Sequence, residues 1–385
     1  MNFKGIKILV LDGFVRQVNG ILESMHDLGC EITTFNLSRL DIGFASRYPK
    51  HKILFKKGKD NKEELYKEIL NEIMSGKYDG VFPISDETTS FIMDNYDEIS
   101  KKVKICAAKP EPFRKAYNKQ ITMEMCQLNG IPCPITRMTD EPIEDFLKRC
   151  SFPLAIKPRE GTGSVGYHKI DTKEQLMKYI DSGEVVPNDY IIQEFISHDG
   201  KHFDTYIFMD ENHECVTKLA GNKIRWFPVD AGSACLIGTV DNEEILDYSV
   251  KLLKAIDWSC FAQIYWIVDP KDNLPKVIEI NGRIPASIKI CPLCGYNIVQ
   301  QELELAFGEK VTKFNPPFKE QYLRYFQTDF LWFIKSKNRF KAKPRWFFPS
   351  KTKDYIFSWR DPWPFFAYSL QCIFRYKKDM KKRKH

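Results

Sequence analysis

The stretch Lys157-Pro158-Arg159-Glu160-Gly161-Thr162-Gly163-Ser164-Val165-Gly166 decides the fold class of this chain. Its three glycines, Gly161, Gly163 and Gly166, allow backbone N–H groups to close around a phosphate. Their GxGxxG spacing is shared by dinucleotide-binding folds and by loops that cover ATP in kinases. Gly161 and Gly166 also have Walker A spacing, but Tyr167-His168 stands where that loop requires Lys-Ser/Thr.

The residues that flank the glycines narrow these alternatives. Residues 152–157 are predicted as a buried strand and residues 167–170 as a second strand. The glycines would then lie in a hairpin, whereas a dinucleotide fold needs them at a strand-to-helix turn, where the pyrophosphate meets the helix N-terminus. The setting disfavours a dinucleotide fold and leaves a loop over ATP open.

Length and composition are those of a globular protein with two or three domains. The chain has 385 residues, of which 43% are apolar and 28% charged. No apolar run approaches the length of a membrane-spanning helix, and the first residues lead into a strand and show no signal-peptide pattern. Eleven scattered cysteines are typical of free thiols in a reducing cytosol, so we expect a cytoplasmic protein.

The N-terminal part alternates short apolar runs with helical periodicity. Strands are predicted at residues 7–12, 31–36 and 80–84, with helices at 16–28 and 61–75. This order predicts a parallel α/β domain over residues 1–110. Ser85-Asp86-Glu87-Thr88 follows a strand, where open sheets bind ligands, although the same residues also suit a helix N-cap.

A second domain is predicted from residue 111, after which a helical stretch ends at Asn129-Gly130. Strands are predicted at 190–195, 202–209, 261–268 and 276–281, and the last two would pair across the turn-rich residues 269–275.

Three oxygen-bearing side chains on that last hairpin predict a magnesium site. Glu279 and Asn281 point to one face of a strand, and Gln263 joins them if the hairpin pairs in register. Magnesium prefers a few protein oxygens completed by water and phosphates. The alternative, a glutamate that simply ends a strand in solvent, stays open on these residues alone.

Further residues have chemistry suited to a nucleotide. Lys157 ends an apolar strand, where a buried charge needs an anionic partner such as phosphate, unless it points to the surface. Arg283 follows the Glu-x-Asn pair and could stabilise charge on a transferring phosphoryl group. The stretch Gln193-Glu194-Phe195-Ile196 could carry a base on its backbone, or could be an ordinary core strand.

The order of these motifs along the chain resembles that of the ATP-grasp superfamily. It is most similar to the carboxylate–amine ligases related to the large subunit of carbamoyl-phosphate synthase and to D-aspartate ligase, and the resemblance covers residues 1 to about 310. The resemblance implies a pre-ATP-grasp α/β domain at 1–110 and an ATP-grasp domain at 111–310, with lobes at about 111–190 and 191–310. A basic, aromatic extension at 311–385 would follow.

The resemblance also implies roles for individual residues. The phosphates of ATP would contact two lysines and lie under residues 161–166, the glycine loop, and the adenine would lie on residues 193–196, the hinge. One or two Mg²⁺ ions, or Mn²⁺ in their place, would bind to the hairpin of residues 261–281. Arg283 would face the γ-phosphate, and Arg225 would meet the carboxylate substrate or phosphate. The nucleotide residues are Lys119, Lys157, Gly161, Thr162, Gly163, Ser164, Gly166, Gln193, Glu194, Phe195, Ile196, His202 and Asp204, and the metal ligands are Gln263, Glu279 and Asn281.

The sequence departs from the family pattern at three places. The ribose-contacting carboxylate of the family is His202 here, with Asp204 as a substitute, and a usual aspartate is Tyr206. The family's Asn-Pro-Arg reads Asn281-Gly282-Arg283. We therefore expect altered nucleotide affinity, with both lysines and the metal set retained.

The C-terminal extension has its own composition. Residues 311–385 carry 13 Lys and 6 Arg against 4 Asp and 1 Glu, a balance of +14, and 21 of these 75 residues are aromatic. Residues 1–310 therefore carry −7 of the total of +7. This mixture suits an anionic membrane surface, although the aromatics could equally pack on the protein body. No recognition module for nucleic acid accompanies the charge.

Two functions follow as hypotheses. The first is an ATP-dependent carboxylate–amine ligase that works through an acyl phosphate, in the cytoplasm or at the inner face of the membrane. Its substrates would be a small or glycan-linked carboxylate and an amine, with a homodimer as an open expectation. The segment around Trp359-Arg360-Asp361-Pro362 resembles proteins of bacterial surface-polysaccharide synthesis. The alternative is a catalytically weak ATP-binding protein of a membrane-associated assembly, and a biotin-dependent carboxylase is disfavoured.

Overall fold

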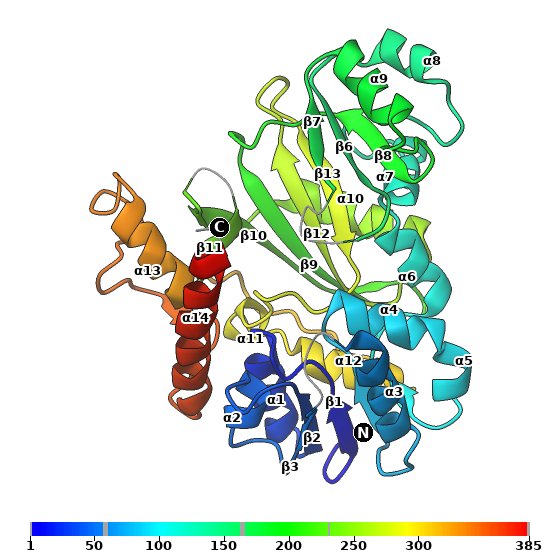
Figure 1. The fold of residues 1–385 in the computed structure, drawn as a ribbon. Helices are drawn as coiled ribbons and strands as arrows, with labels where there is room; N and C mark the ends of the chain where they lie inside the picture. The colour runs from blue at the N-terminus through cyan, green and yellow to red at the C-terminus, as the bar shows by residue number, and fades with distance from the viewer. Residues whose placement is uncertain (1, 57–60, 162–165, 230–231, 383–385) are drawn as a thin grey trace. The chain divides into compact units, whose positions relative to one another are not determined.

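The computed structural model describes residues 2–56, 61–161, 166–229 and 232–382, and the side chains up to residue 374 (Figure 1). The chain forms two compact units. Unit 1 comprises residues 1–107, 223–240 and 283–385, and unit 2 comprises residues 108–222 and 241–282. Unit 1 therefore groups the N-terminal residues with the C-terminal extension, and the three-domain division proposed from the sequence stays a prediction.

A parallel five-stranded sheet forms the N-terminal part of unit 1. Its order is β3-β2-β1-β4-β5, and every pairing is parallel. The strands are β1 (Lys7–Val10), β2 (Glu31–Asn36), β3 (His51–Leu54), β4 (Gly80–Phe82) and β5 (Lys104–Ile105). The connecting helices are α1 (Val18–Asp27), α2 (Ile42–Ala45), α3 (Lys62–Ile73), α4 (Asp86–Asp94) and α5 (Tyr96–Ile99). The chain winds to one side of β1 and then to the other, so the switch point lies between β1 and β4.

A small antiparallel sheet carries the glycine loop in unit 2. It consists of β7 (His168–Ile170), β6 (Leu154–Pro158) and β8 (Tyr190–Glu194), in that order. Its inner residues pack on α8 (Ile143–Arg149) and α9 (Lys173–Asp181), in a core that includes Leu154, Ile156 and Ile192. The antiparallel β6–β7 pairing confirms that the glycines connect two strands of a hairpin.

A seven-stranded sheet has the order β13-β12-β9-β10-β11-β14-β15. Its strands are β9 (His202–Met209), β10 (Cys215–Phe227), β11 (Ser233–Val240), β12 (Cys260–Val268), β13 (Pro275–Asn281), β14 (Tyr322–Arg324) and β15 (Thr352–Asp354). In unit 2, α10 (Glu243–Ala255) packs on β9. The pairing of Gln263 with Asn281 confirms the predicted register of the last hairpin.

Two helices occupy the stretch that was predicted as one helical segment from residue 111. They are α6 (Pro110–Tyr117) and α7 (Lys119–Leu128), separated at Asn118. The side chain of Asn118 accepts hydrogen bonds from the N–H groups of Gln120 and Ile121, and so caps α7. The break makes Lys119 the first residue of a helix, where the helix dipole favours anions.

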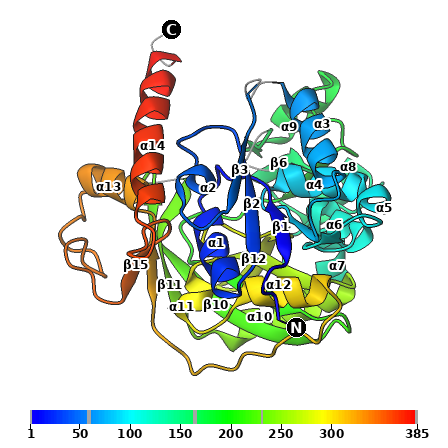
Figure 2. The same ribbon diagram turned by 90° about the horizontal axis from the view of Figure 1, so that it is seen from below.

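The described C-terminal residues of unit 1 form regular secondary structure. Besides β14 and β15, they include α11 (Ile290–Leu293), α12 (Ile298–Ala306), α13 (Phe326–Lys335) and α14 (Trp363–Lys382). Figure 2 shows α14 as one long helix next to α2, and these two helices are in contact. Tyr325, Trp332, Tyr355 and Tyr368 are buried, so part of the aromatic content packs within the unit.

Candidate active site

One face of the small sheet is apolar and the other carries polar side chains. Leu154 and Ile156 face the core, so the alternate residues Ala155 and Lys157 lie on the opposite face. The β6–β8 register pairs Ala155 with Gln193 and Lys157 with Ile191, which places Gln193 on the face of Lys157. The buried Gln193 Oε1 has no hydrogen-bond partner, as expected of a group awaiting a donor from a ligand.

Lys157 reaches from this face to strand β13. Its Nζ lies 3.4 Å from the carbonyl oxygen of Ile278. Ile278 is the residue that the β12–β13 register skips, because Tyr265 pairs with Glu279 and Trp266 with Val277. Ile278 is therefore an additional residue on β13 relative to β12, as in a β-bulge, and such bulges are common beside active sites.

Burial and a neighbouring lysine lower the pKa of Lys157 to about 8. Desolvation is the largest cause. The negative charge of Glu279 opposes it, and the smaller effect of the positive charge of Lys119 acts in the same direction as desolvation. A buried ammonium group that has lost hydration gains from an anionic ligand, and repulsion by Lys119 adds to that gain. Lys157 and Lys119 therefore support a phosphate site in unit 2.

Lys119 is held against the glycine loop. Its backbone N–H donates to the carbonyl oxygen of Arg159, and its Nζ donates to the carbonyl oxygen of Gly161 at 2.7 Å. Gly161 has φ 110° and Gly166 has φ 71°, conformations that favour glycine. Thr162, Gly163 and Ser164, which were also assigned to phosphate, lie outside the described residues.

Strands β9, β12 and β13 gather the predicted metal and ribose residues on one face. One row across the sheet contains Tyr206, Gln263 and Asn281. The next row on the same face contains Asp204, Tyr265 and Glu279. His202, two residues from Asp204, also lies on this face.

The oxygen set fits magnesium that arrives with a nucleotide. Asn281 Nδ2 lies 3.3 Å from Gln263 Oε1, and Glu279 precedes Asn281 by two residues on the same face. One carboxylate and two amide oxygens leave most of the coordination sphere to water and phosphate, as magnesium prefers. Among the described residues, no group of three His, Cys, Asp or Glu side chains could hold a metal by itself.

His202, which is expected from the sequence at the place of a ribose-contacting carboxylate, is committed to hydrogen bonds within unit 2. Its Nδ1 is hydrogen-bonded to the hydroxyl of Tyr265, and its Nε2 to the carbonyl oxygen of His198 at 2.9 Å. Burial, together with the carboxylates of Asp204 and Glu279, raises the pKa of Tyr265. Tyr265 thus links His202 to the metal face, a role that the sequence did not indicate.

The expected hinge is anchored by its own glutamate. Glu194 accepts from Lys276 at 3.0 Å, and Lys276 also contacts Asp269 at 2.8 Å. Although burial alone would lower the pKa of Lys276, its hydrogen bonds to Asp269 and Glu194 raise it. The backbone N–H groups of Glu194 and Phe195 bond to the carbonyl oxygens of Ile135 and Pro153. Any base recognition through these residues must therefore use other groups, and the N–H of Ile196 is the next along the chain.

Sequence reasoning missed Lys276 and Arg159. Lys276 is a charged residue at the start of an apolar strand, the same signal that identified Lys157. Arg159 lies within the quoted glycine stretch, and its buried Nε and Nη2 have no hydrogen-bond partner. Its guanidinium is a further group of unit 2 suited to an anion.

Arg283 belongs to unit 1, where it is paired with Asp86. Arg283 Nε donates to Asp86 Oδ2 at 2.9 Å, and Asp86 is the first residue of α4. Ser85 caps α4, and its hydroxyl and N–H both bond to the buried Asp12 at the end of β1. Arg283 is thereby fixed at the switch point of the parallel sheet, where open α/β sheets bind ligands.

Arg225 does not have the surroundings expected of a substrate-binding residue. Its side chain is 3% exposed and bonds at 3.2 Å to both carboxylate oxygens of Asp329, which is 0% exposed. The guanidinium also lies over the ring of Trp332 and donates to the carbonyl oxygen of Pro344. These partners lie more than 100 residues away in the chain, so no local sequence pattern could predict them. Arg225 holds the C-terminal residues of unit 1, and we leave it out of the proposed site.

The replacement Asp329→Ala is expected to destabilise the protein by about 3–5 kcal/mol, because it leaves the Arg225 charge buried without its carboxylate. Denaturant unfolding would measure the loss. Asp97→Ala, at an exposed aspartate of the same unit, should change stability by less than about 0.5 kcal/mol. The double variant Arg225→Met/Asp329→Leu should recover most of the loss. A loss below about 1 kcal/mol for Asp329→Ala would contradict the structural role of the pair.

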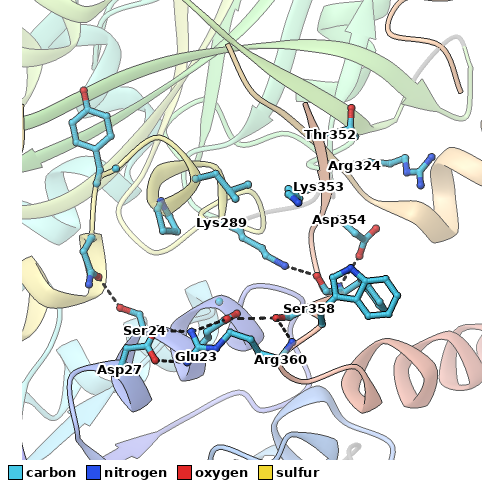
Figure 3. A pocket seen from close by; sticks show the side chains of 18 residues that line it. Glu23, Ser24, Asp27, Lys289, Arg324, Thr352, Lys353, Asp354, Ser358 and Arg360 are labelled. Atoms are coloured by element: carbon cyan, nitrogen blue, oxygen red, sulfur yellow. Dashed lines mark hydrogen bonds and ion pairs between the residues drawn. The ribbon is translucent and has the colours of Figure 1, made fainter. Parts of the chain in front are cut away.

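Unit 1 also contains a cavity of about 740 Å³ between α1, the region of α11, and β15 (Figure 3). Its charged lining is largely paired internally: Arg360 contacts Asp27 and Glu23, and Lys289 donates to the carbonyl oxygen of Phe357 at 2.7 Å. None of the residues predicted to bind ATP lines it. We therefore do not place the nucleotide there.

Known proteins are similar to a large part of this chain. The family model described as the ATP-binding domain of the carbamoyl-phosphate synthase L chain matches residues 114–314. The carbamoyl phosphate synthase large chain of Thermoanaerobacter pseudethanolicus is 22% identical over 248 residues, covering 61% of this chain and 22% of that protein. The D-aspartate ligase of Enterococcus faecium (strain Aus0004) is 26% identical over 231 residues, covering 54% of this chain and 52% of that protein. The chain thus matches about a fifth and about half of these relatives' lengths.

A solved structure shows the same fold at low identity. It is the biotin carboxylase domain dimer of the Hydrogenobacter thermophilus 2-oxoglutarate carboxylase in complex with MgADP, ADP and bicarbonate. The TM-score is 0.65 at 15% identity, with 82% of this chain and 73% of that chain covered. With the parallel sheet of unit 1, this likeness confirms the predicted fold class. The family match, which spans more than half of the residues, shows that the chain belongs to the family of the carbamoyl-phosphate synthase L chain ATP-binding domain, within the ATP-grasp superfamily.

Proposed function

We propose that this protein is an ATP-dependent carboxylate–amine ligase that works through an acyl phosphate. The observation that carries the proposal is the convergence, within unit 2, of two lysines beside the glycine loop with an oxygen-bearing face on β12 and β13. Lysines suit phosphates and the oxygen face suits their magnesium, so the arrangement supports a site for a nucleoside triphosphate. The similarity to a D-aspartate ligase supports ligation of a carboxylate to an amine.

Different residues of unit 2 would bind different parts of the nucleotide. Lys119, Lys157 and the glycine loop would hold the phosphates, and the stretch from Gln193 to Ile196 would hold the adenine. Gln263, Glu279 and Asn281 would hold one or two Mg²⁺ ions, or Mn²⁺, which would neutralise charge on the β- and γ-phosphates. Asp204, beside Tyr265 on the same face, would serve in place of the ribose-contacting carboxylate.

The reaction would proceed in two displacements. A carboxylate oxygen of the substrate attacks the γ-phosphorus, the bond from that phosphorus to the β-phosphate oxygen breaks, and ADP leaves. The two lysines stabilise the negative charge that moves onto the oxygens of the transferring group. The amine nitrogen then attacks the acyl carbon, the carbon–oxygen bond to phosphate breaks, and the departing phosphate accepts the proton that the amine loses.

Arg283 is assigned to the transferring phosphoryl group and to the acyl phosphate. Its pairing with Asp86 through Nε holds the guanidinium at the carboxyl ends of the unit 1 strands, where an open parallel sheet binds ligands.

The alternative function is a catalytically weak ATP-binding protein that serves a membrane-associated assembly. The commitment of His202 to Tyr265 and His198, at a position where the family has a carboxylate, favours this alternative. Such a protein would bind ATP without turnover stimulated by an acceptor.

ADP release in the presence of amino acids and uronic acids separates the two functions. The ligase predicts release that requires both a carboxylate and an amine. Measurable ATP binding without release stimulated by any pair would contradict the ligase and support the alternative.

The pKa of Lys157 predicts a dependence of ATP affinity on pH. Bound phosphates should raise this pKa above its value of about 8 in the free protein, so binding above pH 8 takes up a proton. The affinity should be constant near pH 7 and should fall about fivefold between pH 8 and pH 9. Calorimetry in buffers of different ionisation enthalpy measures both the affinity and the proton. Lys157→Met should remove the dependence, and an affinity of the wild type that stays unchanged up to pH 9 would refute the assignment.

We also propose the setting of this reaction. Its carboxylate or amine would belong to a cell-envelope or surface-polysaccharide precursor, and the protein would work at the cytoplasmic face of a membrane. Homodimer formation is a further part of the proposal, supported by the similar carboxylase structure, which is that of a domain dimer.

A further inference from the structure

Large apolar side chains are exposed mainly in one part of the chain. Among the described residues, twelve such side chains lie between residues 318 and 374, whereas six are spread over the rest of the chain. Single exposed apolar residues are ordinary, but a concentrated set marks an interaction surface. The twelve are Phe318, Phe330, Ile334, Phe340, Phe347, Phe348, Trp359, Trp363, Phe366, Leu370, Ile373 and Phe374.

Helix α14 presents its apolar residues outward. Five of the exposed side chains recur along it at helical spacing and so form one stripe, which we call the α14 stripe: Trp363, Phe366, Leu370, Ile373 and Phe374. The inward side of the same helix carries the buried Tyr368 and Gln371, and Phe365 packs against Phe326 and Phe357. Because the helix already packs on its own protein through that side, the large apolar side chains left exposed on the stripe point to a partner.

Polar contacts fix the direction in which the stripe faces. Gln371 Nε2 donates to the buried Asp41 at 2.7 Å, beside α2. Gln327 of α13 donates to Ser369 at 2.9 Å, and the hydroxyls of Tyr325 and Tyr368 lie 3.3 Å apart. Turning the helix to bury the stripe would break these bonds, and the freed polar groups would lose their buried partners.

Basic residues accompany the exposed aromatics. Between α13 and β15, the exposed Phe340, Phe347 and Phe348 alternate with exposed cations, and Phe348 is 100% exposed. These cations are Lys337, Lys341, Lys343, Arg345 and Lys351. Aromatic and basic side chains in one segment suit the boundary between anionic head groups and acyl chains.

We propose that the α14 stripe and the basic aromatic segment 337–351 bind the surface of an anionic lipid bilayer, with α14 lying in the plane of the interface. Among the described residues, no helix is both long and apolar enough to cross a membrane, which fits a helix that lies on the surface. A second copy of this chain is a less suitable partner for this surface than an anionic bilayer. Symmetric pairing would bring together two C-terminal regions that each carry +14.

Vesicle binding by the full chain tests this inference independently of the ATP site. Vesicles of phosphatidylcholine with phosphatidylserine should bind the protein, binding should weaken with salt, and phosphatidylcholine alone should bind much less. Phe366→Ser/Phe374→Ser should weaken binding by about tenfold for each ring. Lys341→Gln and Lys343→Gln should each weaken it by about fivefold. Leu128→Ser, at an exposed apolar residue of unit 2, should leave it unchanged.

Quenching of tryptophan fluorescence by brominated lipids supplies a second readout on the wild type, which does not depend on the folding of a variant. Quenching is expected because Trp359 and Trp363 are exposed beside or within the stripe. Absence of quenching, equal binding to neutral and anionic vesicles, or equal binding by wild type and double variant would overturn the proposal. A dimer lost in the double variant, without vesicle binding by the wild type, would instead assign the stripe to contacts between copies. Loss of ATP turnover with intact vesicle binding would count only against the proposed function.

Discussion

Lys157→Ala is expected to lower ATP turnover by at least about a hundredfold, since it removes a charge that acts on the transferring phosphoryl group. The lysine lies on the face of the small sheet that also carries Gln193, and its Nζ lies 3.4 Å from the carbonyl oxygen of Ile278, one residue from Glu279. Removing it should weaken ATP binding and lower kcat. Steady-state kinetics with ADP detection, together with calorimetric ATP binding, measure both effects.

Lys173→Ala is the matched control for Lys157→Ala. Lys173 is the first residue of α9, is exposed, and pairs with Glu144 at 2.8 Å, so its removal should leave turnover within about twofold of the wild type. Because Lys157 carries a depressed pKa, its removal should not destabilise the free protein. A fully active Lys157→Ala variant would remove this residue from the site.

Glu279→Ala is expected to lower ATP turnover by at least about a hundredfold, as for Lys157→Ala, because the variant loses a ligand of the metal. Glu279 is the one carboxylate of the set on β12 and β13, and Gln263 and Asn281 supply only neutral amide oxygens. Without it, saturation with Mg²⁺ should require at least about tenfold more metal, since second-shell changes alone cost that much. Turnover titrated with Mg²⁺ and with Mn²⁺ at fixed ATP gives this shift.

Two variants sharpen the test of Glu279. Glu279→Asp keeps the charge and should retain some turnover at high metal concentration, whereas Glu279→Gln should behave like Glu279→Ala. Glu211→Ala, at an exposed glutamate between β9 and β10, should leave the metal dependence unchanged. An unaltered dependence on Mg²⁺ in Glu279→Ala would show that the metal is held elsewhere.

Much of the site could be predicted because its signals are local in the sequence. Lys157 stands out as a charge at the end of an apolar strand, next to glycines that require a hairpin. Glu279 and Asn281 share a face through their spacing alone, and the turn-rich residues 269–275 indicate the hairpin that adds Gln263.

What could not be predicted depends on partners distant in the chain. The Glu194–Lys276 ion pair joins residues 82 apart, and the Arg225–Asp329 pair joins residues 104 apart. The irregularity at Ile278 brings a carbonyl group to Lys157. It cannot be recognised from the order of polar and apolar residues in the strand. The C-terminal residues were identified by composition alone, which shows neither the addition of β14 and β15 to the large sheet nor the outward stripe of α14.

Isotope transfer tests the central claim most directly. A substrate identified by ADP release is prepared with ¹⁸O in its carboxylate and allowed to react to completion with ATP and the amine. The acyl-phosphate route predicts one ¹⁸O in each phosphate released, because the oxygen that attacks the γ-phosphorus leaves with the phosphate. Released phosphate that contains no ¹⁸O would contradict the account, since ATP would then be cleaved without activation of the carboxylate.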